Sequence, residues 1–149
     1  MRRPLLLLML LLTLGTTTYA ATTVHVQDAW VQEAPPGATV LAAYLVIANP
    51  DTQAQTLVSV SSPDFAAVEI HTSQIVNGTA SMTHLKDLTI PARGQQVFAP
   101  GGAHLMLMQP QRALRAGDPV RLRLHFSDTS TLDVTTKVTR GAPDTHHHH

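Results

Sequence analysis

Hydrophobic and polar residues alternate in short runs along the chain, and turn-forming residues separate these runs. Alternation with a period of two is typical of a β-strand that has one face on the core and one in solvent. In residues 120–126 the four apolar side chains are expected to point inward and the three basic ones outward. The other runs are residues 24–31, 40–48, 56–62, 67–75, 79–85, 88–90, 103–108 and 132–138.

These runs predict about eight or nine short strands and no amphipathic helix of useful length. Residues 40–48 are almost continuously apolar, which favours a buried central strand. Within residues 56–62 we expect Leu57 on one face and Val58 and Val60 on the other. The spacing of strands and turns predicts an all-β fold, an antiparallel β-sandwich or Greek-key barrel.

The first twenty residues have the pattern of a signal peptide instead of a strand. Arg2 and Arg3 precede an apolar run, and a small-residue ending allows cleavage near Ala20/Ala21. The run is too short to span a bilayer comfortably, so we expect export to the periplasm without a membrane anchor. We therefore divide the chain into a leader (1–20), one β domain (21–140) and a flexible tail that ends in histidines (141–149).

Composition excludes several functions. Without the two leader arginines, eight basic residues face ten acidic ones, a formal balance of −2. A nucleic-acid partner would require a basic surface, so we expect none. The chain has no cysteine, which excludes disulfides, thiolate metal ligands and a lipid attached to cysteine.

Residues 103–108 carry the most distinctive side chains. On a strand, His104, Met106 and Met108 share one face, while Leu105 and Leu107 share the other. Imidazole and thioether together suit Cu(I), although a buried strand that uses methionine to fill gaps would have the same sequence.

The remaining methionine and histidine residues favour the metal site. Only three of the five methionines follow the leader, and they are Met82, Met106 and Met108. Met82 and His71 flank a predicted hairpin turn at Asn77-Gly78, so we expect them to face each other across adjacent strands.

The spacing of these residues resembles the signature of the periplasmic copper chaperone (PCuAC) family. Ten residues separate His71 from Met82, and twenty-one separate Met82 from the sequence His104-Leu105-Met106. The resemblance extends over most of the chain, through residues 28–30, 35–37, 42–45, 68–71, 100–108 and 114–118.

This resemblance implies a cupredoxin-like barrel that binds Cu(I) through His71, Met82, His104 and Met106. It also implies delivery of copper to the copper-bearing subunit of cytochrome c oxidase, together with a Sco-type partner. Other members of the family commonly have extra methionines near the first two ligands, where this chain has Thr72, Ser73 and Ala80.

Other residues form a secondary group of candidate metal ligands. They are His84, Met108 and the terminal His146, His147, His148 and His149. The four terminal histidines suit Cu(II), and they belong either to a native tail or to a remnant purification tag.

Three other functions are alternatives to copper delivery. A copper storage or resistance protein would use the same site, and a β-sandwich binding module would use no metal. An enzyme is not expected, because we find neither a carboxylate pair nor a Ser-His-Asp arrangement.

Overall fold

The computed structural model describes residues 23–143, which form ten β-strands and no helix. The predicted leader lies outside the described residues, and this part of the chain contains no helix that could span a membrane. The strands are β1 (His25–Gln32), β2 (Val40–Asn49), β3 (Gln55–Ser61), β4 (Phe65–Val76), β5 (Thr79–Leu85), β6 (Leu88–Ile90), β7 (Gly94–Phe98), β8 (Ala103–Pro110), β9 (Pro119–Phe126) and β10 (Thr131–Thr139).

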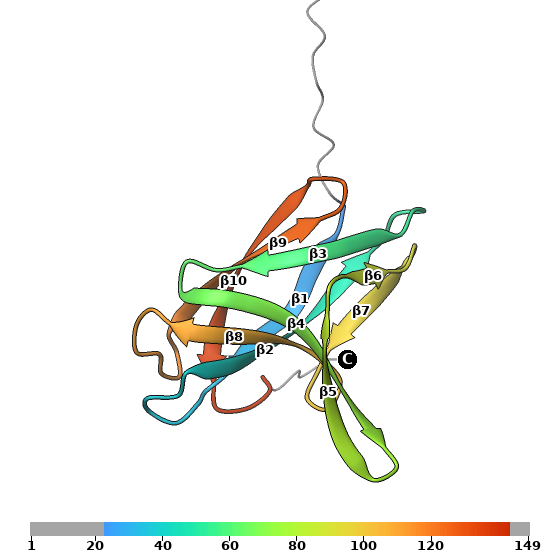
Figure 1. The fold of residues 1–149 in the computed structure, drawn as a ribbon. Helices are drawn as coiled ribbons and strands as arrows, with labels where there is room; N and C mark the ends of the chain where they lie inside the picture. The colour runs from blue at the N-terminus through green and yellow to red at the C-terminus, as the bar shows by residue number, and fades with distance from the viewer. Residues whose placement is uncertain (1–22, 144–149) are drawn as a thin grey trace, which may run out of the picture.

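The strands follow the order β5-β4-β8-β2-β1-β10-β9-β3-β6 (Figure 1). β2 is central: it pairs with β1 on one side, and with β8 and then β7 on the other. The predicted all-β class is confirmed, with ten strands where about eight or nine were expected. The difference arises because β7 is a separate short strand that continues the sheet beside β2.

One pair departs from the antiparallel pattern. β1 and β10, the first and last strands, run parallel, with Val31 opposite Val138. No hairpin joins these two strands, so the chain connections do not force them to be antiparallel. This pair joins two groups of strands, β5-β4-β8-β2-β1 and β10-β9-β3-β6, into one sheet.

Alternating side chains of both groups fill the core. β9 has the predicted pattern, because its four apolar side chains are buried and its two arginines are exposed. Six further strands each place at least one of the most deeply buried residues in this core, namely Val31, Leu45, Leu57, Ile90, Leu105, Leu107 and Val138. The domain is therefore held by apolar packing, since it has no cysteine for disulfides.

The expected alternation in β3 is wrong. Leu57 and Val60 are both buried, whereas Val58 is exposed. The register against β9 shifts between Leu57 and Ser59, which marks a β-bulge. An extra residue at a bulge moves the following side chains to the other face, and this brings Val60 into the core.

Two turns position the neighbouring strands β4, β5 and β8. Asn77 and Gly78 both have positive φ (51° and 77°), as the predicted two-residue turn between β4 and β5 requires. This hairpin extends away from the body of the domain (Figure 1). Gly101, with φ of 83°, forms the bend that leads into β8.

Candidate metal centre

His71 and His104 lie directly opposite each other on the neighbouring strands β4 and β8. Their ring centroids are 5.9 Å apart. His104 is 7% exposed, and His71 is half-buried. Two strands of a continuous sheet thus hold two imidazoles side by side, although 33 positions separate them in the sequence.

His84 on β5, and not Met82, lies directly opposite His71. The ring centroids of His71 and His84 are 5.3 Å apart, so three imidazoles form a row across β5, β4 and β8. Met82 pairs instead with Ser73, which corrects the expected facing pair. The two-residue turn explains this register, since residues equidistant from Asn77 and Gly78 must pair.

The methionines lie on the same face as the imidazole row but on different sides of it. Met106 is opposite Glu69, and Met82 is opposite Ser73, so each is a diagonal neighbour of His71. Diagonal neighbours are about 7–8 Å apart, within reach of long side chains. Met82 is 53% exposed and Met106 is half-buried.

Met108 lies one step further along the same face of β8. It pairs with Ala67 of β4 and Val40 of β2, and is half-buried. Leu105 and Leu107 occupy the opposite face and are buried in the core, as predicted. The alternation in β8 therefore separates the side chains that anchor the strand from those that face the imidazole row.

A backbone hydrogen bond fixes the orientation of His104. Its Nδ1 lies 3.0 Å from the carbonyl oxygen of Gly102. A carbonyl oxygen only accepts, so Nδ1–H is the donor, and the Nε2 of the neutral ring keeps its lone pair. The same carbonyl accepts from the backbone N–H of Ser73 at 3.1 Å, which ties this bend to β4.

A carboxylate holds the other histidine. The Nε2–H of His71 donates to Oε2 of Glu69 at 2.8 Å. This hydrogen bond is the main reason that the pKa of Glu69 lies below its usual range, and the neighbouring His84 and His71 rings lower it further. The Nδ1 of His71 is buried and has no hydrogen-bond partner.

This donor set fits a soft metal ion better than a hard one. Each of the two facing histidines uses one ring nitrogen to hold its orientation and leaves the other with a free lone pair, as in metal-binding histidines. Within residues 23–143, no group of three or more His, Cys, Asp or Glu side chains is placed to hold a metal ion. A metal centre here would therefore need the thioethers.

The other predicted ligands differ in their positions. His84 is exposed beside His71, and Met108 lies beyond Met106 on the same face. The tail histidines His146, His147, His148 and His149 lie outside the described residues. The hydrogen bond between Glu69 and His71 was not predicted, although two residues that are two positions apart on a strand share a face.

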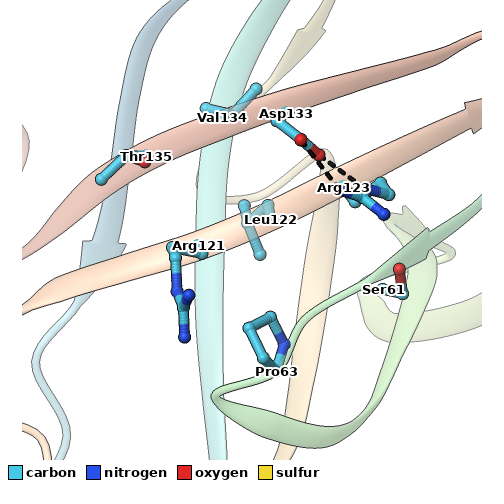
Figure 2. Close-up of a pocket in the computed structure, with 8 residues that line it drawn as sticks. All are labelled: Ser61, Pro63, Arg121, Leu122, Arg123, Asp133, Val134 and Thr135. Atoms are coloured by element: carbon cyan, nitrogen blue, oxygen red, sulfur yellow. Dashed lines mark hydrogen bonds and ion pairs between the residues drawn. The ribbon is translucent and has the colours of Figure 1, made fainter.

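A hollow of about 460 Å³ lies elsewhere, on the outer surface of β3, β9 and β10. In Figure 2 the Arg123 side chain points to Asp133, with Nε–Oδ1 and Nη2–Oδ2 distances of 2.6 and 2.9 Å. Arg123 and Asp133, two of the three charged residues that line the hollow, thus satisfy each other, and we assign the hollow no function.

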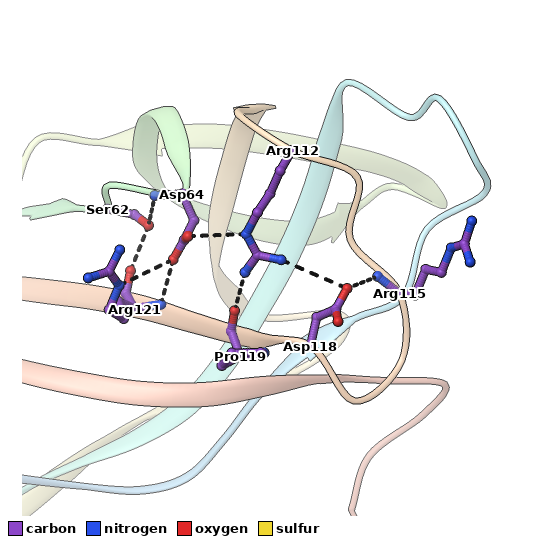
Figure 3. A network of polar contacts seen from close by, with 7 residues as sticks. All are labelled: Ser62, Asp64, Arg112, Arg115, Asp118, Pro119 and Arg121. Carbon is purple, nitrogen blue, oxygen red and sulfur yellow. Dashed lines mark hydrogen bonds and ion pairs between the residues drawn. The ribbon is translucent and has the colours of Figure 1, made fainter.

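A polar network ties two loops together near the start of β4. Asp64 accepts a hydrogen bond from the backbone N–H of Arg121 at 2.9 Å, and its Oδ1 lies 3.5 Å from Nε of Arg112 (Figure 3). Arg112 also donates to the carbonyl oxygen of Pro119. Because the charges of Asp64 and Arg112 are paired within this network, we assign it a structural role.

Comparison with known sequences shows which proteins this chain is similar to. Residues 24–138 match the LpqE-like family, described as "Putative lipoprotein LpqE-like". A "Putative lipoprotein" from Leifsonia xyli is 34% identical over 116 residues, which are 77% of this chain and 69% of that protein. An uncharacterized protein of Rickettsia prowazekii is 29% identical over 103 residues, and the chain spans only 57% of its length.

Solved structures share the fold. A copper-bound PCuAC domain from PmoF2 has a TM-score of 0.68 at 20% identity, covering 83% of this chain and 97% of that domain. The solution structure of Cu(I)-bound DR1885 from Deinococcus radiodurans has a TM-score of 0.64 at 31% identity, covering 86% and 84%. These similarities confirm the resemblance to PCuAC proteins and the cupredoxin-like fold that it implies.

Proposed function

This chain belongs to the LpqE-like family, and on that premise we propose that it is an exported copper chaperone rather than an enzyme. Its cargo is Cu(I), and its ligands are His71, Met82, His104 and Met106. Copper in the solved PmoF2 and DR1885 structures supports this choice of ion. The names of the family and of one relative describe lipoproteins, but these 149 residues contain no cysteine for a lipid.

One observation carries the proposal. His71 and His104 face each other across β4 and β8, and each has one anchored ring nitrogen and one free lone pair. The Nδ1 of His71 is buried without a hydrogen-bond partner, and a metal ion would give it one. The thioethers of Met82 and Met106 lie on the same face and select a soft ion.

The same ligand set suits transfer. Thioethers are neutral, so they hold Cu(I) without the strong bonds that a thiolate would form. Met82 is 53% exposed and lies on a projecting hairpin, where an acceptor can reach it. We propose the binuclear copper centre of cytochrome c oxidase as the destination and a Sco-type protein as a partner, on the strength of the resemblance of the His-Met spacing.

Copper titration of single variants tests the site. With Cu(I) and a competing chromogenic chelator, His104→Ala and Met106→Ala should weaken binding at least about 10-fold, a loss of about 1.4 kcal/mol. Met108→Ala is the matched control, because Met108 is the same residue type on the same face of β8. Equal affinities for Met106→Ala and Met108→Ala would contradict the assignment.

A cellular experiment tests delivery. We expect cells that lack this protein to have an oxidase with less copper when copper is scarce, and the wild-type gene, but not His104→Ala, to restore it. Normal oxidase copper with reduced tolerance of excess copper would instead favour storage or resistance.

A further inference from the structure

We propose that Glu69 is a positioning residue that makes His71 present Nδ1, and not Nε2, to copper. This inference rests on the proposed function, since it concerns how the same site holds its ion. It assigns different ring nitrogens to the two histidines, Nδ1 for His71 and Nε2 for His104.

The geometry of β4 places the carboxylate where it can hold the ring. Glu69 and His71 are two residues apart, so their side chains share a face of the strand. The distance of 2.8 Å between Oε2 and Nε2 is that of a strong, charge-assisted hydrogen bond. An ionised carboxylate only accepts, so the proton must be on Nε2 and the lone pair on Nδ1.

The burial of Nδ1 leads to the same conclusion. The Nδ1 of His71 is buried without a partner, a condition that native proteins rarely leave unexplained. Binding through Nε2 would remove the hydrogen bond to Glu69 and leave Nδ1 unsatisfied. Binding through Nδ1 keeps the hydrogen bond and gives the buried nitrogen a partner.

Charge gives Glu69 a second effect on the bound ion. The four proposed ligands are neutral, so a bound Cu(I) would keep its positive charge in a partly buried place. The Glu69 carboxylate opposes Met106 across β4 and β8 and hydrogen-bonds to a ligand ring. A carboxylate in this position makes the imidazole a stronger electron-pair donor to the metal. Removing such a carboxylate typically costs about 10–100-fold in metal affinity.

A measurement on the metal-free protein tests the hydrogen bond alone. In ¹⁵N-edited spectra at about pH 8, where ordinary imidazole is neutral, the Nε2–H of His71 should exchange slowly with water. Glu69→Ala should abolish this signal, and Glu69→Gln, whose amide oxygen still accepts, should retain it in weakened form. Glu33→Gln is the matched control, since it makes the same change beyond β1 and should have no effect. Rapid exchange in the wild-type protein would overturn the inference.

Cu(I) titration then tests which nitrogen binds. Cu(I) should shift the Nδ1 resonance of His71 and the Nε2 resonance of His104, while both N–H protons remain. Affinity should fall in the order wild type, Glu69→Gln, Glu69→Ala, with the last about 10–100-fold weaker. A merely space-filling role would leave Gln equal to Glu, because the two side chains have nearly the same size.

The outcomes separate this inference from the proposed function. If Cu(I) shifts Nε2 of His71 and removes its proton, copper displaces Glu69 and the inference is wrong, while the copper site stands. If Cu(I) moves neither histidine, the proposed function fails, and with it the role of Glu69 toward copper. Glu69 has 36% of its side chain exposed, so its replacement should leave the fold intact, as circular dichroism would confirm.

Discussion

Leu105 and Met106 are adjacent on β8 but face opposite sides of the sheet, so replacing each with alanine should have opposite consequences. Leu105 is 1% exposed and lies between Ile70 of β4 and Ala43 of β2 in the register of the sheet. Met106 faces the imidazole row and is half-buried. We expect Leu105→Ala to lower stability and spare copper binding, and Met106→Ala to weaken copper binding with a smaller loss of stability.

The burial of each side chain sets the size of the effects. Replacing a fully buried leucine with alanine removes its transfer free energy and leaves a cavity, which together cost about 3 kcal/mol here. For a domain of this size, that loss lowers Tm by about 10–15 °C. Truncating the half-buried Met106 should cost about 1 kcal/mol, because only part of its apolar surface leaves contact.

Denaturant unfolding measures both effects in one experiment. Trp30 is the sole tryptophan, is buried, and packs against Tyr44 at a ring-centroid distance of 4.7 Å, so its fluorescence reports the loss of the core. With free Cu(I) at about 100 times Kd, binding should stabilise the wild type and Leu105→Ala by about 2.7 kcal/mol. Met106→Ala should gain much less at the same copper concentration.

Two results would refute this reasoning. If Met106→Ala loses as much stability as Leu105→Ala, Met106 belongs to the core and the two faces of β8 are not distinct. If Leu105→Ala loses its copper-dependent stabilisation while remaining folded, the site depends on core packing in a way that the alternation does not describe.

Three further predictions concern other parts of the domain. Met82→Ala should weaken Cu(I) binding but change the free energy of unfolding by less than about 0.5 kcal/mol, as is usual for an exposed side chain; a large stability loss would show that Met82 packs in the core. Asp64→Ala should cost about 2 kcal/mol in denaturant unfolding without changing copper affinity, because it leaves groups on Arg121 and Arg112 without their carboxylate; unchanged stability would mean that the network of Figure 3 contributes nothing. Burial raises the pKa of Tyr44 above its usual value, so its contribution to stability should be complete below about pH 10 and be lost as the pH rises through the raised pKa. Phenolate absorbance of residues 21–149, in which Tyr44 is the sole tyrosine, would measure this, and titration at the ordinary pKa would contradict it.

Local patterns in the sequence were sufficient to predict those features that depend on a single strand or a single turn. The alternation of β9, the separation of Leu105 from Met106, and the turn at Asn77-Gly78 all depend on residues within a few positions of one another. The same turn also fixes His84 opposite His71, so this pair was predictable from the sequence by counting outward from the turn. The bulge in β3 was not predictable from the sequence, because it depends on how β3 packs against β9.

The arrangement of the site could be predicted only in part. The spacing of His71, Met82 and His104 indicates a copper site through family resemblance, but it does not give the order of strands. His71 meets His104 because β4 lies beside β8. The hydrogen bond that Glu69 accepts depends on the orientation of two side chains. The alternation of residues along a strand gives only the face on which each side chain lies.

The candidate ligands differ in how far their side chains are exposed, and this difference affects the order in which they would leave a bound ion. His104 is 7% exposed and fixed to the backbone of Gly102, while Met82 is 53% exposed on the projecting hairpin, across the imidazole row from Met106. If copper binds here, the buried imidazole can leave the ion only by disturbing the sheet, whereas the thioether of Met82 can swing away freely. An incoming acceptor ligand would then replace Met82 first and His104 last, so copper would pass through a shared intermediate bound to both proteins and would never be released as a free ion.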